Sequence, residues 1–501
     1  MTTLLIKNGY VLTLDESDRV FDPCDVLVRD DRIVAVGPHL ANDTETIDTI
    51  IDAAGKLVMP GLVNAHLHSS ENLLRGLAAG LPNELWNLPV WPPLGQSHSS
   101  PRLLYLNTLF GAMEMVRGGI TTVQDQDPAW HQSPHGEGAQ AFVSGYTNLG
   151  MRANIVTDIV DLPWHESIAG LAETLPPDML AELTRPENAE HMEVGSVQNA
   201  LRVCETAIQQ WQGHAGLITV AIGPSALTRC SEEFLGRAGE LARAHRIPLY
   251  IHVLESRMQR DLCQKRHGGA TARYMKSIGL LDSLTALVHA VWATDDDIEQ
   301  FSQADCTVVH SPVSNLYLGS GIMPYARMAD HGVRLALGTD GMAATGRLSM
   351  FENMKLAAML HTTTTPDFER WPAASHILRM ATHGSARSAG LASQVGALTA
   401  GLKADIIILD LHGLGFTPLN NVVNQLVYSE SGDSVETVII NGRVVMQNRQ
   451  FANIDEMSIM AEIRSYAPRI RDAQAAAWKA SQPLYPILDR LYQKSWQTPE
   501  G

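Results

Sequence analysis

The chain has 501 residues, 45% of them hydrophobic and 18% charged, and a formal net charge of −17 at pH 7. This length and composition predict one large globular domain with a smaller one, and scattered Lys and Arg residues in an acidic chain disfavour nucleic-acid binding. The five cysteines lie far apart and form no CxxC pair, and we find no secretory leader and no apolar run long enough to span a bilayer. We therefore expect a soluble cytoplasmic protein with no membrane partner.

Both ends of the chain are rich in short strand-like segments separated by turn residues. Residues 3–60 contain "LLIKNGYVLTLD" and "DVLVRDDRIVAVG", and the same texture returns near residue 394 in "VGALTAGLKADIIILDL" and "VETVIINGRVV". We therefore expect residues 1–60 and 394–455 to pair into one composite β-sandwich domain. The last segment, 456–501, is expected to be helical.

Between these ends, apolar strands alternate with helical segments. The strands include "GITTVQDQD", "GLITVAIGPSA", "LTALVHAVWA" and "VRLALGTDG", and "EEFLGRAGELARAH" is one of the amphipathic helices. Repeated β-then-α units over residues 61–393 predict a parallel sheet with crossover helices, and about eight units predict a (β/α)8 TIM barrel. An open doubly wound sheet is the alternative architecture.

The first barrel strand ends in "PGLVNAHLHSS", where His66 and His68 are separated by one leucine. Side chains two positions apart on a strand point the same way, so both imidazoles can reach one divalent metal ion. Histidine pairs of this kind are also common on surfaces and in ordinary hydrogen bonds. The pair therefore needs further ligands before it supports a metal site.

Further candidate ligands follow other apolar runs. His252 and Glu255 lie in "IPLYIHVLES", His289 ends "LTALVHA", and Asp340 ends "VRLALGTDG". Taken singly, each histidine could be a hydrogen-bonded core residue and Asp340 a helix N-cap. Barrel enzymes place their chemistry at the carboxyl ends of the strands, so the shared position of these residues favours one common site.

Ordered motifs extend over nearly the whole chain: "PGLVNAHLH", "GITTV", "HVLES", "LVHAVW", "HSPVSNLYLGSG", "LGTDG" and "GLKADIIILDL". In this order they resemble the amidohydrolase superfamily, in its branch of mononuclear-metal deaminases and s-triazine hydrolases. The resemblance implies one divalent metal ion per chain, Zn²⁺ with Fe²⁺ as the alternative, held by His66, His68, His252 and Asp340. No lysine stands in the strand-end motifs of the barrel, so the bridging carboxylated lysine of the binuclear branches is not expected.

The resemblance also implies catalytic roles. The position of Glu255 shuttles protons to a ring nitrogen and to the leaving group. His289 and Asp340 orient the attacking water and accept its proton. Acid and base assistance of this kind is typically worth about 10²–10⁴-fold in rate.

Substrate contacts are expected from the Trp- and Pro-rich segment "PNELWNLPVWPPLGQSH", where relatives build a pocket wall. Trp86 and Trp91 can stack on a flat heterocycle and Gln96 can hydrogen-bond it, although both tryptophans could equally pack the loop onto the barrel. Asn315 is a further candidate, with the alternative that it only holds its turn. After Asp340 the chain reads "GMAATGRLSMFENMK" and lacks the Ser-Asn or Asn-Asp pair that relatives often carry, which indicates altered substrate contacts there.

These observations predict a metal-dependent aminohydrolase that releases ammonia from a small N-heterocycle of the triazine, pyrimidine or purine type. The same residues could instead hydrolyse a C–Cl bond of a triazine or the C–N bond of a urea, carbamate or amide. A non-catalytic barrel that serves as a binding module is disfavoured, because the metal and acid–base positions are all present. Relatives are commonly homo-oligomers, so a homo-oligomer is expected.

Overall fold

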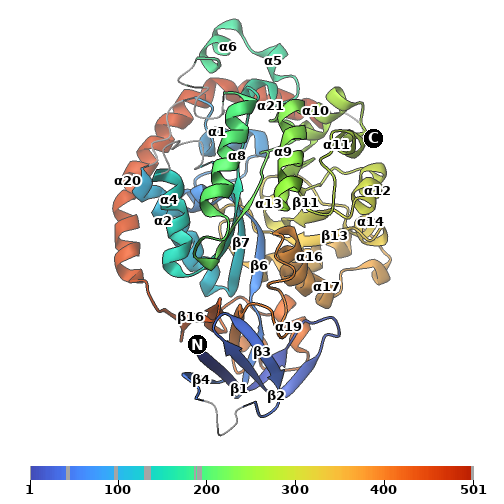
Figure 1. The fold of residues 1–501 in the computed structure, drawn as a ribbon. Coiled ribbons are helices and arrows are strands. Elements are labelled where there is room, and N and C mark those ends of the chain that lie inside the picture. Colours follow the sequence, from blue (N-terminus) through green and yellow to red (C-terminus); the bar gives the residue numbers. More distant parts are fainter. Residues whose placement is uncertain are drawn as a thin grey trace.

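The computed structural model describes residues 2–40, 46–94, 100–128, 137–185, 188 and 195–497. Its body is a barrel of parallel strands surrounded by helices, and a β-rich unit built from both ends of the chain lies at one end of the barrel (Figure 1). The predicted fold class, a (β/α)8 barrel with a small terminal β domain, is confirmed.

The barrel contains two four-stranded parallel sheets, in the orders β6-β7-β8-β9 and β10-β11-β12-β13. A bridge between Ile222 and Leu249 joins the two sheets, and a hydrogen bond of 2.9 Å from Asp340 N to His66 O closes the other seam. All residues of β6 and β7 are buried, as expected for strands covered on both faces. The barrel strands are β6 (Leu62–Leu67), β7 (Ile120–Asp127), β8 (Arg152–Thr157), β9 (Ile218–Ala221), β10 (Leu249–Val253), β11 (Thr285–His289), β12 (Thr307–His310) and β13 (Arg334–Leu337).

Helices on the outside connect consecutive strands. Helix α9 shows why they begin and end where they do: Ser231 Oγ accepts a hydrogen bond from Phe234 N at its start, and Arg246 takes the left-handed conformation at its end. The main outer helices are α2 (Pro101–Arg117), α4 (Glu137–Leu149), α8 (Val197–Trp211), α9 (Glu232–His245), α10 (Arg257–His267), α11 (Thr271–Ser277), α12 (Asp295–Gln303), α14 (Tyr325–Asp330), α16 (Met350–Leu360), α17 (Ala374–Arg379) and α18 (Ser385–Ser388).

Shorter helical segments follow the carboxyl ends of strands, where a barrel carries its functional loops. These segments are η1 (Ser69–Leu74), α1 (Asn83–Val90), η2 (Trp164–Glu166), α5 (Leu171–Thr174), α6 (Pro177–Leu183), α13 (Pro312–Tyr317) and α15 (Met342–Thr345). They form the rim above the strand ends.

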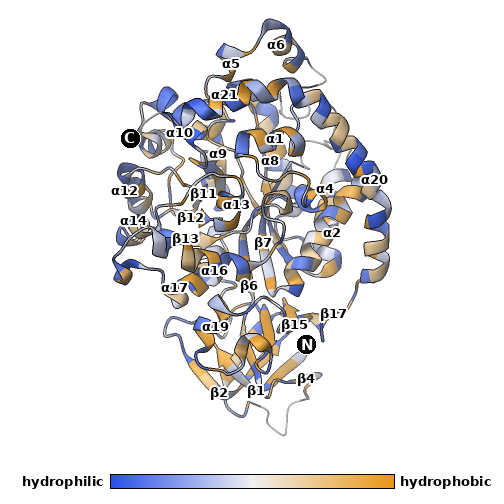
Figure 2. Ribbon diagram, turned by 180° about the vertical axis from the view of Figure 1, so that it is seen from behind, coloured by the Kyte–Doolittle hydropathy of each residue, from blue (hydrophilic) through white to orange (hydrophobic). Residues whose placement is uncertain are grey.

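The barrel interior is filled by small side chains around one large one. Tyr250 lies among buried alanines and valines, which are Ala65, Val156, Ala221, Ala286, Val288, Val309 and Ala336. A second and larger apolar core lies between the strands and the outer helices. Figure 2 shows the same division, with hydrophobic colour on the strands and hydrophilic colour on much of the outer helices.

The two ends of the chain form one nine-stranded sheet in the order β17-β16-β15-β14-β5-β1-β2-β3, with β4 paired to β1. A buried bidentate ion pair ties this sheet to the barrel: Arg152 Nε and Nη2 lie 2.8 and 2.9 Å from the carboxylate oxygens of Asp405. The strands are β1 (Thr3–Leu12), β2 (Val20–Arg29), β3 (Arg32–Gly37), β4 (Thr49–Asp52), β5 (Lys56–Pro60), β14 (Ile406–Asp410), β15 (Val435–Ile440), β16 (Arg443–Gln447) and β17 (Gln450–Phe451), with α19 (Val422–Tyr428) between β14 and β15.

Two helices end the chain, α20 (Glu456–Ser481) and α21 (Tyr485–Ser495). Helix α20 begins near the terminal sheet and runs along the outside of the barrel to the opposite end (Figure 1).

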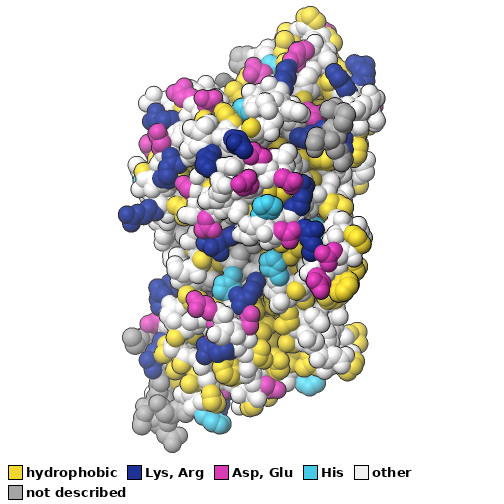
Figure 3. Space-filling view, turned by 90° about the vertical axis from the view of Figure 1, so that its right-hand side faces the viewer, with side chains coloured by type: hydrophobic (Ala, Val, Ile, Leu, Met, Phe, Trp, Pro, Cys, Tyr) yellow, Lys and Arg dark blue, Asp and Glu magenta, His cyan; other side chains and the backbone are white. Residues whose placement is uncertain are grey.

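No described helix combines the length and apolarity that crossing a bilayer requires. Figure 3 shows one face of the molecule, on which basic and acidic side chains intermingle.

Candidate active site

Histidine and aspartate side chains converge where the barrel strands end. Two overlapping groups, His66 with His68 and His252, and His66 with His289 and Asp340, each bring three possible ligand atoms within 4.8 Å of one another. Asp340 Oδ1 lies 3.5 Å from His66 Nε2 and 3.8 Å from His68 Nε2. The fold therefore gathers residues that are 274 positions apart in the chain (340 − 66) at one point.

Two of these histidines are fixed by backbone carbonyl groups. Nδ1 of His68 lies 2.6 Å from Gln126 O, and Nδ1 of His252 lies 2.6 Å from Ser225 O. A carbonyl oxygen only accepts a hydrogen bond, so in each neutral ring the proton is on Nδ1. In this neutral form, each Nε2 atom keeps its lone pair for a ligand.

His66 is oriented by Tyr250 in the middle of the barrel. The Tyr250 hydroxyl donates to Ala65 O at 2.6 Å, so its oxygen accepts from His66 Nδ1 at 2.8 Å. His66 Nε2 is buried without a hydrogen-bond partner among the described residues, and burial lowers the pKa of His66 well below its usual value. A neutral imidazole with an unpartnered lone pair near a carboxylate oxygen fits a divalent cation.

The electrostatic surroundings also favour a cation. Burial alone would lower the pKa of His68, but the carboxyl groups of Asp340 and Glu71 contribute to raising it to about 9. Burial also opposes the ionisation of Asp340, yet nearby histidines and hydrogen bonds lower its pKa overall. Ser314 Oγ donates to Asp340 Oδ2 at 2.5 Å, and Gly341 N donates to Oδ1 at 2.7 Å. The carboxylate is therefore both charged and held in place.

Glu255 and His289 lie beside this cluster. Glu255 Oε1 is 3.9 Å from His289 Nε2, and Glu255 Oε2 accepts a hydrogen bond of 3.1 Å from Gln259 Nε2. On the other side of the imidazole, His289 Nδ1 lies 2.9 Å from Asn315 Oδ1. Both His289 and Asp340 have positive φ angles, 71° and 70°, and strained backbone of this kind concentrates at functional sites.

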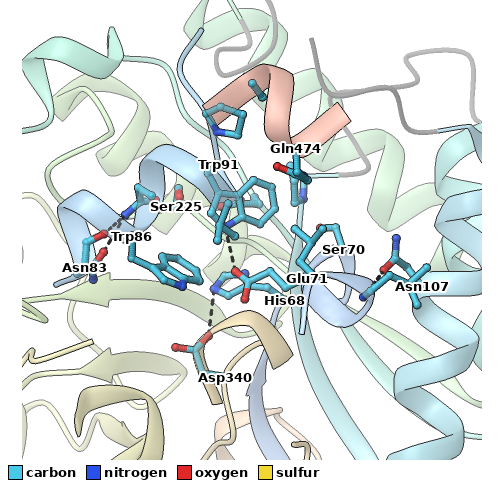
Figure 4. A pocket seen from close by; sticks show the side chains of 18 of the residues that line it. His68, Ser70, Glu71, Asn83, Trp86, Trp91, Asn107, Ser225, Asp340 and Gln474 are labelled. Atoms are coloured by element: carbon cyan, nitrogen blue, oxygen red, sulfur yellow. Dashed lines mark hydrogen bonds and ion pairs between the residues drawn. The ribbon is translucent and has the colours of Figure 1, made fainter. Parts of the chain in front are cut away.

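A cavity of about 590 Å³ opens above the cluster, within the size range of small-molecule sites. Its walls lie outside the barrel: Trp86 and Trp91 come from α1 and the residue after it, and Gln474 comes from α20 (Figure 4). Trp86 Nε1 donates to Ala343 O at 3.3 Å, and Trp91 Nε1 donates to Glu71 Oε1 at 2.9 Å. The cavity thus has a polar floor and aromatic walls.

The comparison with known proteins agrees with this geometry. The model of the amidohydrolase family matches residues 57–445. The chain belongs to the amidohydrolase family. It is 33% identical over 472 residues to a 5'-deoxyadenosine deaminase of Methanosarcina mazei, an alignment that covers 94% of this chain and 99% of that relative.

Two solved structures share the fold of this amidohydrolase. A crystal structure of an adenosine deaminase from Xanthomonas campestris with bound zinc superposes with a TM-score of 0.80 at 28% identity, covering 94% of this chain and 99% of that one. A triazine hydrolase of Arthrobacter aurescens superposes with a TM-score of 0.82 at 24% identity, covering 93% and 100%. At that identity the second likeness supports the fold alone.

The residues predicted to contact substrate fall into three groups. Trp86 and Trp91 line the cavity of this amidohydrolase. Asn315 is fully buried against His289 and is not among the described residues that line the cavity, so its contact with substrate stays a prediction. Gln96 lies outside the described residues.

Other residues of the amidohydrolase site were not singled out from the sequence. Tyr250, Glu71 and Glu84 are fully or almost fully buried, and burial raises the pKa of Glu71 to about 8 and that of Glu84 to about 7. Ser256 Oγ, next to Glu255, donates to Glu84 Oε1. The position of Glu71, three residues after His68, is the one sequence signal that could have revealed any of these three residues.

Proposed function

We propose that this amidohydrolase is a metal-dependent deaminase that hydrolyses the exocyclic C–N bond of an amino-substituted N-heterocycle and releases ammonia. The observation that carries the proposal is the convergence of His66, His68, His252 and Asp340 beside Glu255, at the base of a cavity with aromatic walls. Relatives named as deaminases support the same class of reaction. Triazine, pyrimidine and purine rings are the proposed substrate class.

We propose that His66, His68, His252 and Asp340 hold one divalent ion per chain, Zn²⁺ with Fe²⁺ as the alternative. When bound, such an ion lowers the pKa of a coordinated water from about 15.7 toward about 7 and so supplies a nucleophile at neutral pH. Three imidazole nitrogens and one carboxylate oxygen suit both metals. The bound zinc of the adenosine deaminase neighbour favours Zn²⁺.

Protons are then moved by the side chains around the cluster. His289 presents the lone pair of Nε2 because Asn315 Oδ1 holds the proton on Nδ1, so His289 and Asp340 can accept the proton of the attacking water. Glu255 can deliver a proton to a ring nitrogen and later to the departing amino group. The reaction balances as ring–NH₂ plus H₂O giving ring–OH plus NH₃.

The substrate is proposed to be a small molecule whose flat ring faces Trp86 and Trp91, with Gln96 as a further hydrogen-bonding partner. Both tryptophans line the cavity, which supports their part of this proposal. A homo-oligomeric state and a cytoplasmic location are further proposals. So is the division of the chain into a terminal β domain (1–60 and 394–455), a catalytic barrel (61–393) and a helical segment (456–501).

The test couples metal analysis to a product screen. Purified protein is analysed for zinc and iron, and ammonia and chloride release are measured over aminated and chlorinated triazines, pyrimidines and purines, with ureas and carbamates included. We expect about one metal ion per chain and ammonia from at least one amino-heterocycle. Glu255→Gln should lower kcat by about 10²–10⁴-fold without changing metal content.

Glu240→Gln serves as the matched control, because Glu240 lies on α9 with a side chain 68% exposed. Release of chloride without ammonia would show that the enzyme hydrolyses a C–Cl bond. Release of ammonia or an amine from a urea or carbamate would show that it hydrolyses the C–N bond of that substrate. A protein that binds no divalent metal after reconstitution would contradict the reaction proposed here.

A further inference from the structure

Glu71 is a buried carboxyl group that the proposed reaction does not use. It lies in η1, three residues after His68, and only 1% of its surface is exposed. It lines the cavity, and among the described residues its carboxyl group accepts a hydrogen bond from Trp91 alone. Burying a carboxyl group with so few hydrogen-bond donors costs free energy, so its place beside the proposed metal ligands calls for a function.

The two carboxyl oxygens of Glu71 differ in their surroundings. Oε1 accepts the hydrogen bond from Trp91 Nε1, whereas Oε2 has no hydrogen-bond partner within the described part of the chain. Figure 4 shows the carboxyl group between Trp91 and His68, with its bond to Trp91 dashed. A buried acceptor without a donor is unfavourable, and a ligand that brings an N–H group removes that cost.

The backbone beside Glu71 makes room for this carboxyl group. A Cβ atom at Gly341 would lie 2.0 Å from Glu71 Oε2, so any other residue there would displace it. The φ angle of Gly341 is −71°, which every residue adopts, so glycine here provides space and not a special conformation. Gly341 directly follows Asp340, so Oε2 lies next to the reacting centre.

We propose that Glu71 is a specificity-determining residue whose Oε2 accepts a hydrogen bond from an N–H or amino group of the substrate ring in the metal-loaded protein, while Trp91 holds Oε1. There the positive charge of the neighbouring ion favours the ionised carboxylate, which accepts hydrogen bonds and does not donate them. The inference rests on the proposed function, because it assumes an N-heterocycle in the cavity. It assigns the enzyme a preference for rings that carry amino groups over rings of the same size that lack them.

The experiment measures that preference by binding. The zinc-loaded Glu255→Gln protein, which should turn its ligands over about 10²–10⁴-fold more slowly, is titrated calorimetrically with three pairs that differ by one amino group. The pairs are melamine with 2,4-diamino-6-methyl-s-triazine, adenine with purine, and cytosine with 2-hydroxypyrimidine. We expect at least one pair to show about tenfold tighter binding of the amino-richer member.

Two substitutions added to that protein separate recognition from the holding of Trp91. Glu71→Leu removes both acceptors, whereas Glu71→Gln can keep an oxygen for Trp91 and then places an NH₂ group where Oε2 was. We expect both substitutions to reduce the preference for the amino-richer ligand to within about threefold. The indole N–H resonance of Trp91 in the NMR spectrum is assigned by its loss in Trp91→Phe. We expect Glu71→Gln, but not Glu71→Leu, to keep the chemical shift of this resonance. Glu240→Leu is the control, because it removes an exposed carboxyl group on α9 that does not line the cavity.

Three results would overturn the proposal. The first is an unchanged preference in Glu71→Leu, and the second is a loss in Glu71→Leu but not in Glu71→Gln, which would reduce Glu71 to a support for Trp91. The third is the absence of any preference in all three pairs before Glu71 is changed. Failure of the proposed function has a different signature, namely no ammonia from the protein that retains Glu255, whatever the binding preferences are.

Discussion

The floor and the outer wall of the cavity are built in different ways. The floor consists of side chains at the ends of barrel strands, of which His68 and His252 are half-buried and the others buried. Each of its histidines has a hydrogen-bond partner on Nδ1. The wall comes from α1 and α20, outside the barrel, and Gln474 Oε1 on α20 has no hydrogen-bond partner among the described residues. We therefore expect the floor to fix the chemistry, and the wall together with the adjacent Glu71 to choose the substrate.

The largest effect is expected from the floor, where the proposed metal ligands lie. His66→Ala removes a fully buried proposed ligand, and we expect kcat/KM to fall by about 10⁴-fold or more together with the bound metal. Metal content and initial rates measure both quantities. His245→Ala, at the exposed end of α9, is the control. An active protein that keeps its metal without His66 would show that the floor is not a metal site.

The next effect concerns a contact between wall and floor. Glu84 on α1 accepts a hydrogen bond from Ser256, which caps α10 beside Glu255. Burial raises the pKa of Glu84 from 4.5 to about 7. The folded protein therefore binds the carboxyl proton of Glu84 more tightly than the unfolded chain does. The stabilisation of the fold by this proton is complete below pH 4.5 and is lost as the pH rises through 7.

Glu84→Gln should remove this pH dependence. Between pH 5 and pH 8, we expect the free energy of unfolding of the natural protein to fall by about 2–3 kcal/mol more than that of the variant. Denaturant titrations at both pH values measure it, with Glu240→Gln as the exposed control. If the free energies of unfolding of the natural protein and of Glu84→Gln changed equally with pH, the pKa of Glu84 would not be raised in the folded state.

The difference between floor and wall also explains what could be predicted from the sequence. His66, His252, His289 and Asp340 end apolar runs, so a local pattern reveals them, and the strand register brings them together. Helix α20 could be expected as a helix, but its place over the cavity depends on packing against distant parts of the chain.

Tyr250 shows a limit of another kind. In the sequence it is one apolar residue of a buried strand, and its hydroxyl partner, His66, lies 184 positions away. Glu71 is similar, because its hydrogen bond to Trp91 crosses from η1 to the loop after α1. The long-range contacts themselves leave no local pattern in the sequence, which is why the proposed ligands were predicted and their supporting residues were not.

A smaller effect is expected from the support of the floor. Tyr250→Phe removes the hydroxyl that accepts from His66 Nδ1 but keeps the ring that fills the barrel. Because such partners orient a metal ligand, we expect zinc affinity to fall by about 10–100-fold. Competition with a chromophoric chelator measures it, and Tyr274→Phe, whose hydroxyl meets Glu232 at the exposed surface, is the control. Equal zinc affinity in both variants would mean that packing alone orients His66.

The smallest effect is expected from the wall, where Ala477 on α20 faces the cavity and is 5% exposed. Ala477→Phe narrows the outer cavity without touching the floor, so we expect KM for a ring with a bulky substituent to rise by about tenfold or less while kcat for a single-ring substrate stays within about twofold. Ala476→Phe places the same side chain on an exposed neighbouring position and is the control. A large fall in kcat for the single ring would show that α20 also shapes the floor, and the separation of chemistry from substrate choice would then fail.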